Sequence, residues 1–300
     1  MIKLESLRTF VIVANAGNIA DAAERIGRTP SAVSMALRQL EDDIGGALFE
    51  TDRKNALTAL GQFTLETAAA QIPGFDASVR AIRAFASNQI GRLSITSVPS
   101  VAANILPGCL QGFLAERPDV EVELLDADSR SVATMIDAGA TELGIAGPPV
   151  QAARLSFTPL FSDRFRIVFD RSSPLWKIQR PLIWQDLHDV TFIRNEASDA
   201  IDLPELRAQY FRASMTVRNV TSLLAMVRAG VGVTLLPALA TSNLPEGLAA
   251  RDIDFRGCAR EVGLISRKGR TLSPVAAAFS AHLQQEILNT ATNLNISPIS

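Results

Sequence analysis

The sequence contains few of the residues that hold metal ions or form disulfide bonds. Only two of the 300 residues are cysteines and only two are histidines. Cys109 and Cys258 stand far apart in no metal-binding pattern, and neither His188 nor His282 lies in a zinc-binding motif. We therefore expect no metal, no cofactor and no disulfide-built secreted domain. An inert buried thiol is the favoured role for each cysteine, although arginines two positions to either side of Cys258 leave a redox role open.

The sequence also lacks long apolar runs and a net charge of either sign. Nowhere do about 18 consecutive apolar residues occur, and the first ten residues, MIKLESLRTF, lack the apolar core of a signal peptide. With 29 basic and 31 acidic side chains the formal charge is −2, so the total charge favours neither nucleic acid nor a membrane surface. We expect a cytoplasmic protein with no membrane partner. Its length and its apolar content of 47% suggest two or three domains.

Sequence motifs of enzymes are missing as well. There is no GxSxG, P-loop or HExxH pattern. The GxG in AGVGVTLLP lacks a third glycine and precedes a predicted strand, which favours a tight turn over a dinucleotide site. Asp126 and Asp128 are candidate catalytic carboxylates, but solvated loop charges are the favoured interpretation without a partner motif. We therefore expect that the protein is not an enzyme and has no catalytic residue.

The first 58 residues carry the pattern of a small helical unit. Apolar residues recur at helical spacing over 4–14, 19–26 and 33–44. Typical helix ends separate these stretches, because Asn and Thr cap a helix start, proline suits its first turn and glycine follows its end. Residues 45–58, GGALFETDRKNALT, favour a short β-hairpin or wing. The predicted end residues are Gly17, Asn18, Gly27, Thr29 and Pro30.

The outer face of the third helix carries mostly small side chains. On a helical wheel of about 100° per residue, three apolar residues fall within roughly 40° of Val33 and form with it the stripe expected to be buried. Ser31, Met35 and Arg38 lie roughly 140° to 200° away from Val33. Small side chains, hydroxyls and one arginine suit close approach to the major groove of DNA. The predicted buried stripe consists of Val33, Leu37, Leu40 and Ile44.

Residues 18–61 resemble the N-terminal helix-turn-helix of the LysR-type transcriptional regulators. This context favours DNA binding over the alternative, a helical hairpin with an ordinary solvated face. Pro30 stands where the family often has glutamine, and Thr51 stands where it often has arginine, so the operator sequence is not transferable. The shared features are the Ala22-Ala23 pair, Ser31-Ala32-Val33-Ser34, Leu40-Glu41, Gly45, Leu48-Phe49, Leu57-Thr58 and Gly61. The predicted DNA-binding residues are Arg28, Thr29, Pro30, Ser31, Ser34, Met35, Arg38, Arg53 and Lys54.

The charge of this unit is weak for a DNA-binding domain. Residues 1–65 carry seven basic and eight acidic side chains, a net charge of −1, whereas DNA binding normally shows a basic footprint. The distribution favours DNA binding more than the total does, because Arg28, Arg38, Arg53 and Lys54 fall at the turn, the third helix and the tip of the wing. We expect few phosphate contacts per subunit and a dependence on multivalent binding.

An alanine-rich helix and an α/β domain follow the helical unit. Residues 59–90 predict a long helix, with a kink or break near Ile72 because Pro73 and Gly74 interrupt it. From residue 91 strands alternate with helices, which predicts a parallel sheet. The last residues, NTATNLNISPIS, are expected to be loosely ordered.

The resemblance extends more weakly to this second part, through ILPGCLQGFLAERPDVEVEL, ELGIAG and AGVGVTLLP. It implies the fold class α/β with three domains: a winged helix-turn-helix over 1–58, a dimerising linker helix over 59–90 and an effector-binding domain over 91–300. The last domain would resemble the two-lobed periplasmic binding proteins. Its expected lobe I covers about 91–161 and 268–292, and its lobe II about 162–267.

Four residues are candidate effector contacts. Ser100 directly follows a predicted strand and starts a helix, where free N–H groups attract an anion. A simple helix cap is the alternative for Ser100, and the resemblance favours an effector contact because the matching position often binds effector. Ser129 follows the next strand, and Arg194 and Asn195 follow VTFI and would come from the opposite lobe. For these three, an exposed loop residue is the favoured alternative.

Taken together, these patterns predict a sequence-specific transcriptional regulator of LysR type. The expected partners are double-stranded DNA with an imperfect palindromic operator, a small organic and anionic effector, and further copies of the chain in a homodimer or homotetramer. RNA polymerase is a further candidate partner. The rival interpretation is a solute-binding or small-molecule-processing α/β protein without DNA function, which has no use for the first 60 residues.

Overall fold

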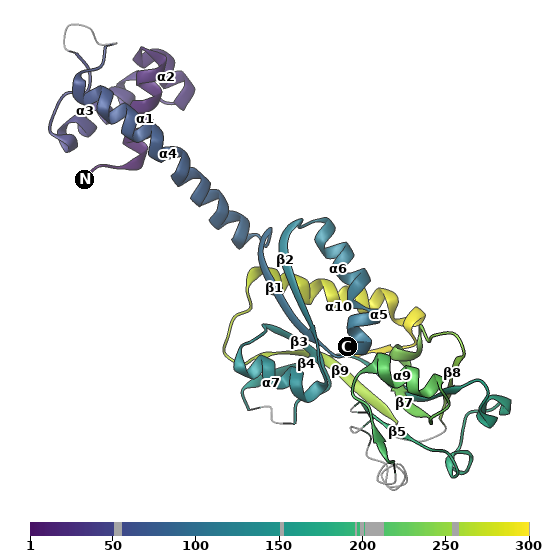
Figure 1. Cartoon of the computed structure of the whole chain (residues 1–300). Helices are drawn as coiled ribbons and strands as arrows, with labels where there is room; N and C mark the ends of the chain where they lie inside the picture. The colour runs from purple at the N-terminus through teal and green to yellow at the C-terminus, as the bar shows by residue number, and fades with distance from the viewer. Residues whose placement is uncertain are drawn as a thin grey trace. The chain divides into compact units, whose positions relative to one another are not determined.

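The chain folds into two compact units, Met1–Ala84 and Phe85–Ser300 (Figure 1). The computed structural model describes residues 1–50, 56–150, 153–195, 197–198, 201, 213–253 and 258–299. A mixed α/β fold with an N-terminal helix-turn-helix is thereby confirmed. The division into three domains at residues 58 and 90, and the limits of the two lobes, stay predictions.

Three helices build the core of the first unit. They are α1 (Leu4–Ala16), α2 (Ile19–Ile26) and α3 (Pro30–Ile44). The predicted helix ends are confirmed: Asn18 Oδ1 accepts a hydrogen bond from the Asp21 N–H at 2.8 Å, and Gly17 and Gly27 follow α1 and α2 with φ of 71° and 69°. Gly45 follows α3 in the same way, with φ of 89°. Glycine suits these positions because other residues pay a steric cost at positive φ. The buried apolar core of this unit consists of Phe10, Val13, Ala22, Ala23, Val33, Leu37, Leu40 and Leu48.

The predicted wing begins and ends as a hairpin. Phe49 and Leu57 form an antiparallel bridge, and the Glu50 N–H donates to the Ala56 carbonyl at 2.9 Å. The tip of the wing, residues 51–55, lies outside the described residues. Beyond the hairpin, a Cβ added to Gly61 would lie 2.0 Å from the Leu48 carbonyl oxygen. Glycine at position 61 therefore allows the next helix to pack directly against the wing.

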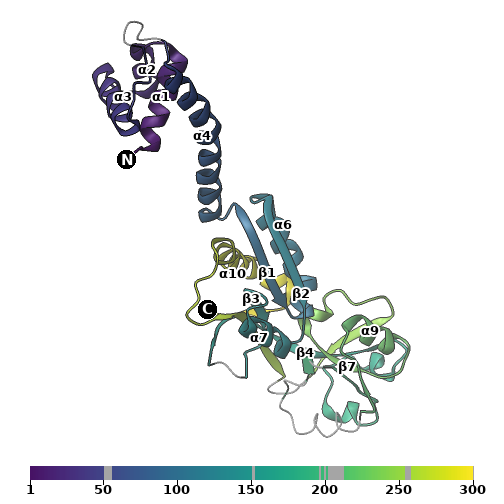
Figure 2. The same ribbon diagram turned by 60° about the vertical axis from the view of Figure 1, so that its left-hand side comes forward.

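That helix, α4 (Ala59–Ala86), runs 28 residues with Pro73 inside it. Of the predicted kink or break, the break is wrong and the helix bends instead, because a proline removes one hydrogen bond and a long helix tolerates that loss as a local bend. Figure 2 shows the helix axis changing direction part way along. An ion pair also holds α4 against α1: Arg8 Nη1 donates to Asp76 Oδ2 at 2.7 Å. This hydrogen bond from Arg8 lowers the pKa of Asp76 below its ordinary value.

The second unit is built on a mixed sheet with the strand order β10-β4-β9-β3-β1-β2. Strand β1 pairs in parallel with β2 and with β3, whereas β9 is antiparallel to both β3 and β4. Within this sheet the predicted parallel pairing is therefore right for β1, β2 and β3, which are joined by helical crossovers, and wrong for β4, β9 and β10. The strands are β1 (Ile90–Ser97), β2 (Asp119–Asp126), β3 (Leu143–Ala146), β4 (Leu155–Asp170), β9 (Ala259–Arg267) and β10 (Ser297–Pro298).

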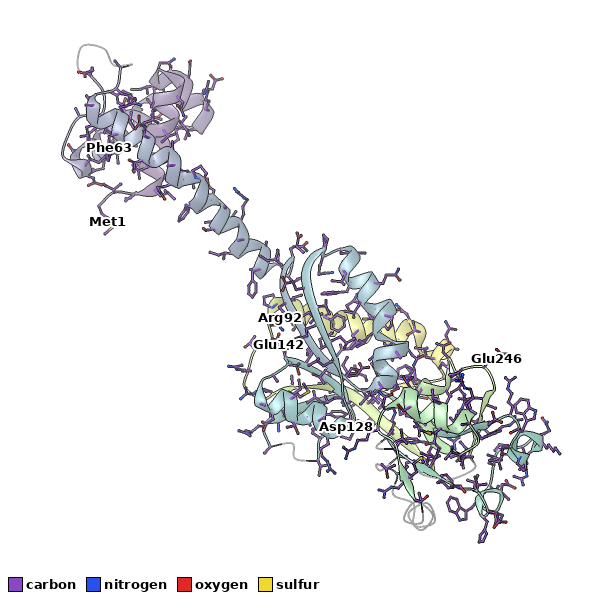
Figure 3. All side chains as sticks on the ribbon, viewed as in Figure 1. Met1, Phe63, Arg92, Asp128, Glu142 and Glu246 are labelled. Atoms are coloured by element: carbon purple, nitrogen blue, oxygen red, sulfur yellow. The ribbon has the colours of Figure 1, made fainter. Side chains whose placement is uncertain are left out.

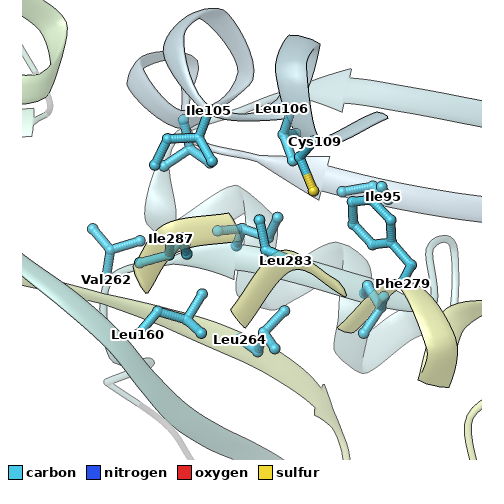
Figure 4. Packing of buried hydrophobic residues seen from close by; sticks show 14 of the residues in the cluster. Ile95, Ile105, Leu106, Cys109, Leu160, Val262, Leu264, Phe279, Leu283 and Ile287 are labelled. Atoms are coloured by element: carbon cyan, nitrogen blue, oxygen red, sulfur yellow. The ribbon is translucent and has the colours of Figure 1, made fainter. Parts of the chain in front are cut away.

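Helices cover both faces of this sheet and form lobe I with it. On one face Phe113 and Phe279 meet edge to face, with ring centroids 5.3 Å apart, and Figure 4 shows Cys109, Ile95 and Phe279 packed together. On the opposite face Thr96 Oγ1 lies 3.9 Å from Met135 Sδ, as the alternation of side chains along a strand requires. The helices are α5 (Pro99–Asn104), α6 (Leu106–Ala115), α7 (Ser129–Ala138) and α10 (Pro274–Leu294).

Lobe II forms around the far half of β4. There β4 pairs antiparallel with β7 and with β8, and the short strands β5 and β6 pair in parallel. Because β4 continues from lobe I into these pairs, it belongs to both lobes. The elements are η1 (Pro174–Lys177), η2 (Trp184–Leu187), β5 (Ile193–Arg194), β6 (Met215–Thr216), α9 (Val220–Arg228), β7 (Thr234–Pro237), η4 (Ala238–Thr241) and β8 (Leu248–Asp252).

The end of the chain is ordered, contrary to the prediction of a loose tail. Helix α10 continues to Leu294, and β10 then pairs antiparallel with β4, with Ser297 opposite Ser162. Ile296 is buried and anchors this strand. The few apolar side chains among these polar residues were too weak a sequence signal to predict a strand. Over the described part of the chain, no helix is both long enough and apolar enough to cross a membrane.

Candidate DNA-binding and effector sites

Helices α2 and α3 form a tight helix-turn-helix. The Gly27 N–H donates to the Glu24 carbonyl at 3.1 Å, and the Arg28 N–H donates to the Ala23 carbonyl at 2.9 Å. These two bonds close the end of α2. Thr29 Oγ1 then accepts from the Ala32 N–H at 3.3 Å, so Thr29 caps α3 as predicted. The chain thus turns between the two helices in very few residues.

The outer face of α3 carries the residues that the helical wheel placed there. Ser31, Met35 and Arg38 are exposed, and Met35 has 71% of its surface accessible. Val33, Leu37 and Leu40 are buried on the inner face, whereas Ser34 and Ile44 are partly buried. The predicted buried stripe is therefore confirmed for Val33, Leu37 and Leu40, and Ile44 packs at its edge, partly buried. Pro30, in the first turn, is exposed too.

The arginines in the turn before α3 and on its outer face make few contacts with acidic side chains of the described protein. Arg28 Nη2 lies 3.7 Å from Glu5 Oε1, and both side chains are about half exposed, so this ion pair contributes little. Among the described residues Arg38 makes no side-chain hydrogen bond or ion pair. Its guanidinium therefore needs to break no internal contact to reach a base edge or a phosphate. Arg53 and Lys54, the two predicted wing residues, lie outside the described residues.

Ser100, the first candidate effector residue, lies at the start of α5 as predicted. It is 8% exposed, and its Oγ accepts a hydrogen bond from Arg260 Nη2 at 2.8 Å. Helix α5 has only six residues, so its N-terminal field is weak. The N–H groups of Val101 and Ala102 already donate to the Val98 carbonyl at 3.0 and 3.1 Å. The positive group nearest to Ser100 is therefore the Arg260 side chain.

Arg260 is itself held by a buried carboxylate. Arg260 Nε donates to Asp163 Oδ1 at 2.7 Å, and the Asp163 side chain is completely inaccessible. Asp163 Oδ2 accepts from the Leu239 N–H at 3.0 Å. A buried carboxylate requires such partners, because an unpaired one would be strongly destabilising. Sequence reasoning missed this pair, since the two residues are 97 positions apart and only the three-dimensional pairing of β4 with β9 joins them.

Ser129 is the first residue of α7 and does not cap it. Asp128 does, by accepting from the N–H groups of Arg130 and Ser131 at 2.9 and 3.0 Å; Figure 3 shows Asp128 at the start of this helix. Ser129 Oγ accepts from the Gly147 N–H at 3.3 Å, just beyond the end of β3. Ser129 thus lies at the carboxyl edge of the parallel strands, on the same edge as Ser100.

Asn195 and Arg194 lie in lobe II. Asn195 is 4% exposed, its Nδ2 donates to Thr234 Oγ1 and to the Leu235 carbonyl at 2.8 Å each, and its Oδ1 accepts from the Ser198 N–H at 3.2 Å. These bonds use its amide to hold β7, which is a structural role. Arg194 is partly buried in β5. No observation joins either residue to Ser100, so their effector roles stay predictions.

Both cysteines are buried. Burial raises the pKa of the Cys109 thiol to about 12 and also raises the pKa of Cys258. A thiol with a raised pKa is a poor nucleophile, which favours the inert role for both. Among the described residues no group of three or more histidine, cysteine or acidic side chains is arranged to hold a metal ion.

Two family models match the chain. The model described as bacterial regulatory helix-turn-helix protein, lysR family, matches residues 4–62. The model described as LysR substrate binding domain matches residues 86–287. The first model covers α1 to α3 and the wing, and the second covers the unit that contains Ser100 and Arg260.

Curated proteins resemble the chain over nearly its whole length. The uncharacterized HTH-type transcriptional regulator YbhD of Escherichia coli (strain K12) is 28% identical over 294 residues, which cover 94% of this chain and 90% of that protein. The transcriptional activator protein LysR of the same organism is 28% identical over 303 residues, covering 98% of this chain and 96% of LysR.

Solved structures show the same fold. CbnR, a LysR family transcriptional regulator, superposes with a TM-score of 0.71 at 23% identity and covers 94% of this chain and 100% of its own. Full-length CbnR complexed with its target DNA also has a TM-score of 0.71, at 24% identity, covering 95% and 99%. Since the substrate-binding model alone spans more than half of the chain, the chain belongs to the LysR family of DNA-binding transcriptional regulators, and its second unit is the effector-binding domain of that family.

Proposed function

We propose that this regulator binds an imperfect palindromic operator as a homodimer or a pair of dimers, through the outer face of α3, and that a small organic anion in the second unit modulates binding or activation. The observation that carries the first part is the outer face of α3. Ser31, Met35 and Arg38 are exposed opposite a buried apolar stripe. A recognition helix needs this arrangement, because its base-reading side chains must project away from its own core.

The weak net charge of the DNA-binding unit favours binding by paired subunits. The first 65 residues have a net charge of −1, so one subunit releases few counterions from DNA and binds weakly at physiological salt. Two linked subunits add their contacts. Helix α4 offers an apolar surface for pairing, and Figure 3 shows Phe63 on this helix. The exposed apolar residues of α4 are Leu60, Phe63, Phe75, Ile82 and Phe85.

The proposed effector site lies at the edge of the sheet where the parallel strands of lobe I end. Ser100 and Ser129 both lie where these strands end, and ligands of open α/β sheets bind at that edge. Arg260 brings a positive charge within 2.8 Å of Ser100 Oγ, which favours an effector with an anionic group. RNA polymerase is the partner we expect in addition where the protein activates transcription.

Capture of genomic fragments tests this function. The full-length wild-type chain, incubated with sheared genomic DNA of its source, should retain a small set of fragments that lie near its own gene and share one motif. Arg38→Ala should lose that enrichment, whereas Gln39→Ala, an exposed neighbour on α3, should keep it. A wild-type chain that enriches no sequence would favour the rival, an α/β protein that binds small molecules without DNA function.

A further inference from the structure

One buried network joins four elements of the second unit. Arg260 on β9 contacts Ser100 on α5 of lobe I and Asp163 on β4, and Asp163 accepts from the Leu239 N–H on η4. Helix η4 directly follows β7 of lobe II, and the Leu239 side chain packs in the core of lobe I. Strand β4 runs through both lobes, so this pair lies where the chain passes from one lobe to the other. A second contact, from Asn243 Nδ2 to Asn104 Oδ1 at 3.2 Å, joins α5 to the segment after η4.

We propose that Arg260 recognises the anionic group of the effector and that Asp163 positions Arg260 for this contact. The proposal rests on the proposed function and deepens it, since it assigns the ligand class to a residue outside the four predicted from the sequence. The start of α5 offers an anion at Ser100 little positive charge, because the helix has only six residues and begins with Pro99. The N–H groups of Val101 and Ala102 already donate to the Val98 carbonyl. Arg260 supplies the missing positive charge.

Arg260 retains the capacity to bind a ligand. A guanidinium has five N–H donors, and Asp163 and Ser100 accept from Nε and Nη2 only. The side chain is 13% exposed. A carboxylate seated beside Ser100 would accept from the remaining donors of Arg260 and from the Ser100 hydroxyl, whose oxygen already accepts from Arg260. Planar bidentate contact with a carboxylate is the geometry that arginine favours.

Asp163 acts on the ligand only through Arg260. Its two oxygens already accept from Arg260 and from the Leu239 N–H, and its side chain is wholly inaccessible. It also neutralises Arg260, so that the protein buries a charge pair instead of a lone charge. A ligand that draws on Arg260 therefore alters a contact shared with η4, the segment through which the chain returns from β7 of lobe II to the core of lobe I, and this links occupancy of the site to the arrangement of the lobes.

Matched pairs of acids and amides test the charge that the site selects. The probes are acetate, propionate, benzoate and succinate, each beside its amide, titrated into the full-length chain by calorimetry and by thermal unfolding. The wild type should bind at least one acid and should not bind its amide. Arg260→Gln should weaken binding of that acid by at least about tenfold, the lower range for a hydrogen bond to a charged group. Arg260→Lys should retain part of the preference for the acid.

Two controls separate positioning from folding. Arg164→Gln, which changes an exposed arginine on β4 beside the network, should bind the acid as the wild type does. Asp163→Asn alone leaves Arg260 without its counter-charge and should lower the melting temperature. The double variant Asp163→Asn with Arg260→Gln restores a neutral hydrogen-bonded pair, so it should recover stability without recovering acid binding.

Three results would contradict a role of Arg260 in binding the anionic group. An Arg260→Gln chain that melts normally and binds the acid as tightly as the wild type would overturn it. So would a wild type that binds an amide as well as its acid, or that binds no acid of the panel. All variants should still bind operator DNA without ligand. Loss of DNA binding by the wild type itself would instead count against the proposed function.

Discussion

Arg38 is available for DNA because of its position on α3. It lies on the face opposite Val33 and Leu37, is exposed, and makes no internal polar contact among the described residues. The sequence was sufficient to predict this, because the helical period and the cap at Thr29 define the start of the helix and its faces. The predicted DNA contacts at the tip of the wing, Arg53 and Lys54, lie outside the described residues.

Arg38→Ala should weaken operator binding by about 1–3 kcal/mol, the range for one arginine contact with a base. The folded state should be unchanged, because the side chain packs against nothing in the core. Titration of a labelled operator at fixed salt measures the effect, with Gln39→Ala as the matched control. Equal affinities for wild type and Arg38→Ala would remove this residue from the DNA-binding surface.

Val33→Asp should unfold the first unit, since Val33 is completely buried and the substitution buries an unpaired charge. The loss should exceed about 4 kcal/mol, which is the large end of single-residue effects. Urea denaturation followed by circular dichroism measures it. A variant that melts as cooperatively as the wild type would show that the face assignment of α3 is wrong.

At the scale of elements, Gly61 determines how α4 packs against the wing. A Cβ at this position would lie 2.0 Å from the Leu48 carbonyl oxygen, which is backbone and cannot rotate away. Gly61→Ala should therefore cost about 1–3 kcal/mol, as overpacking does. Gly74→Ala is the matched control in the same helix, because a Cβ there meets nothing within 4 Å. It should instead stabilise the helix by roughly 0.5–1 kcal/mol.

Thermal unfolding of the two glycine variants beside the wild type measures both effects. Similar melting temperatures for Gly61→Ala and Gly74→Ala would contradict the packing of α4 on the wing. The sequence predicted α4 but could not decide between a kink and a break at Pro73, since the contact that holds the second half of the helix, Arg8 with Asp76, joins residues 68 positions apart.

The Arg8–Asp76 pair should make the stability of the first unit depend on acid pH. The hydrogen bond from Arg8 lowers the pKa of Asp76 in the folded state. The stability that it contributes is therefore present above the unfolded value, 3.8, and is lost as pH falls through the lower folded pKa. Asp76→Asn should remove this part of the acid dependence. Thermal unfolding between neutral and acidic pH compares the two chains, and parallel curves would contradict the expectation.

The sheet shows the limit of prediction at this scale. Strands β1, β2 and β3 alternate with helices, so their parallel pairing followed from the order of elements along the chain. The antiparallel strands β9 and β10 return from distant parts of the chain, and no local pattern gives their direction. The Asp163–Arg260 pair arises from that long-range pairing, which is why the sequence revealed Ser100 and missed its partner.

At the scale of the whole molecule, affinity for DNA should depend on assembly. Leu60 and Phe63 are exposed on α4, with 38% and 67% of their surfaces accessible. Substitution of both by polar residues should weaken pairing of subunits and reduce operator binding, although each helix-turn-helix stays folded. Light scattering and DNA titration on the same preparation measure the two effects. A monomeric double variant with wild-type affinity would refute the dependence on pairing.

The central claim is that two paired subunits each recognise DNA through the outer face of α3. It is tested most directly by selecting bound duplexes from a random DNA library with the wild-type chain and with Arg38→Ala. The wild type should enrich an imperfect palindrome whose half-sites lie about one helical turn, or a multiple of it, apart. Arg38→Ala should lose the preference at the corresponding position of each half-site. Enrichment of no motif, or of the same motif with equal strength by both proteins, would contradict the account.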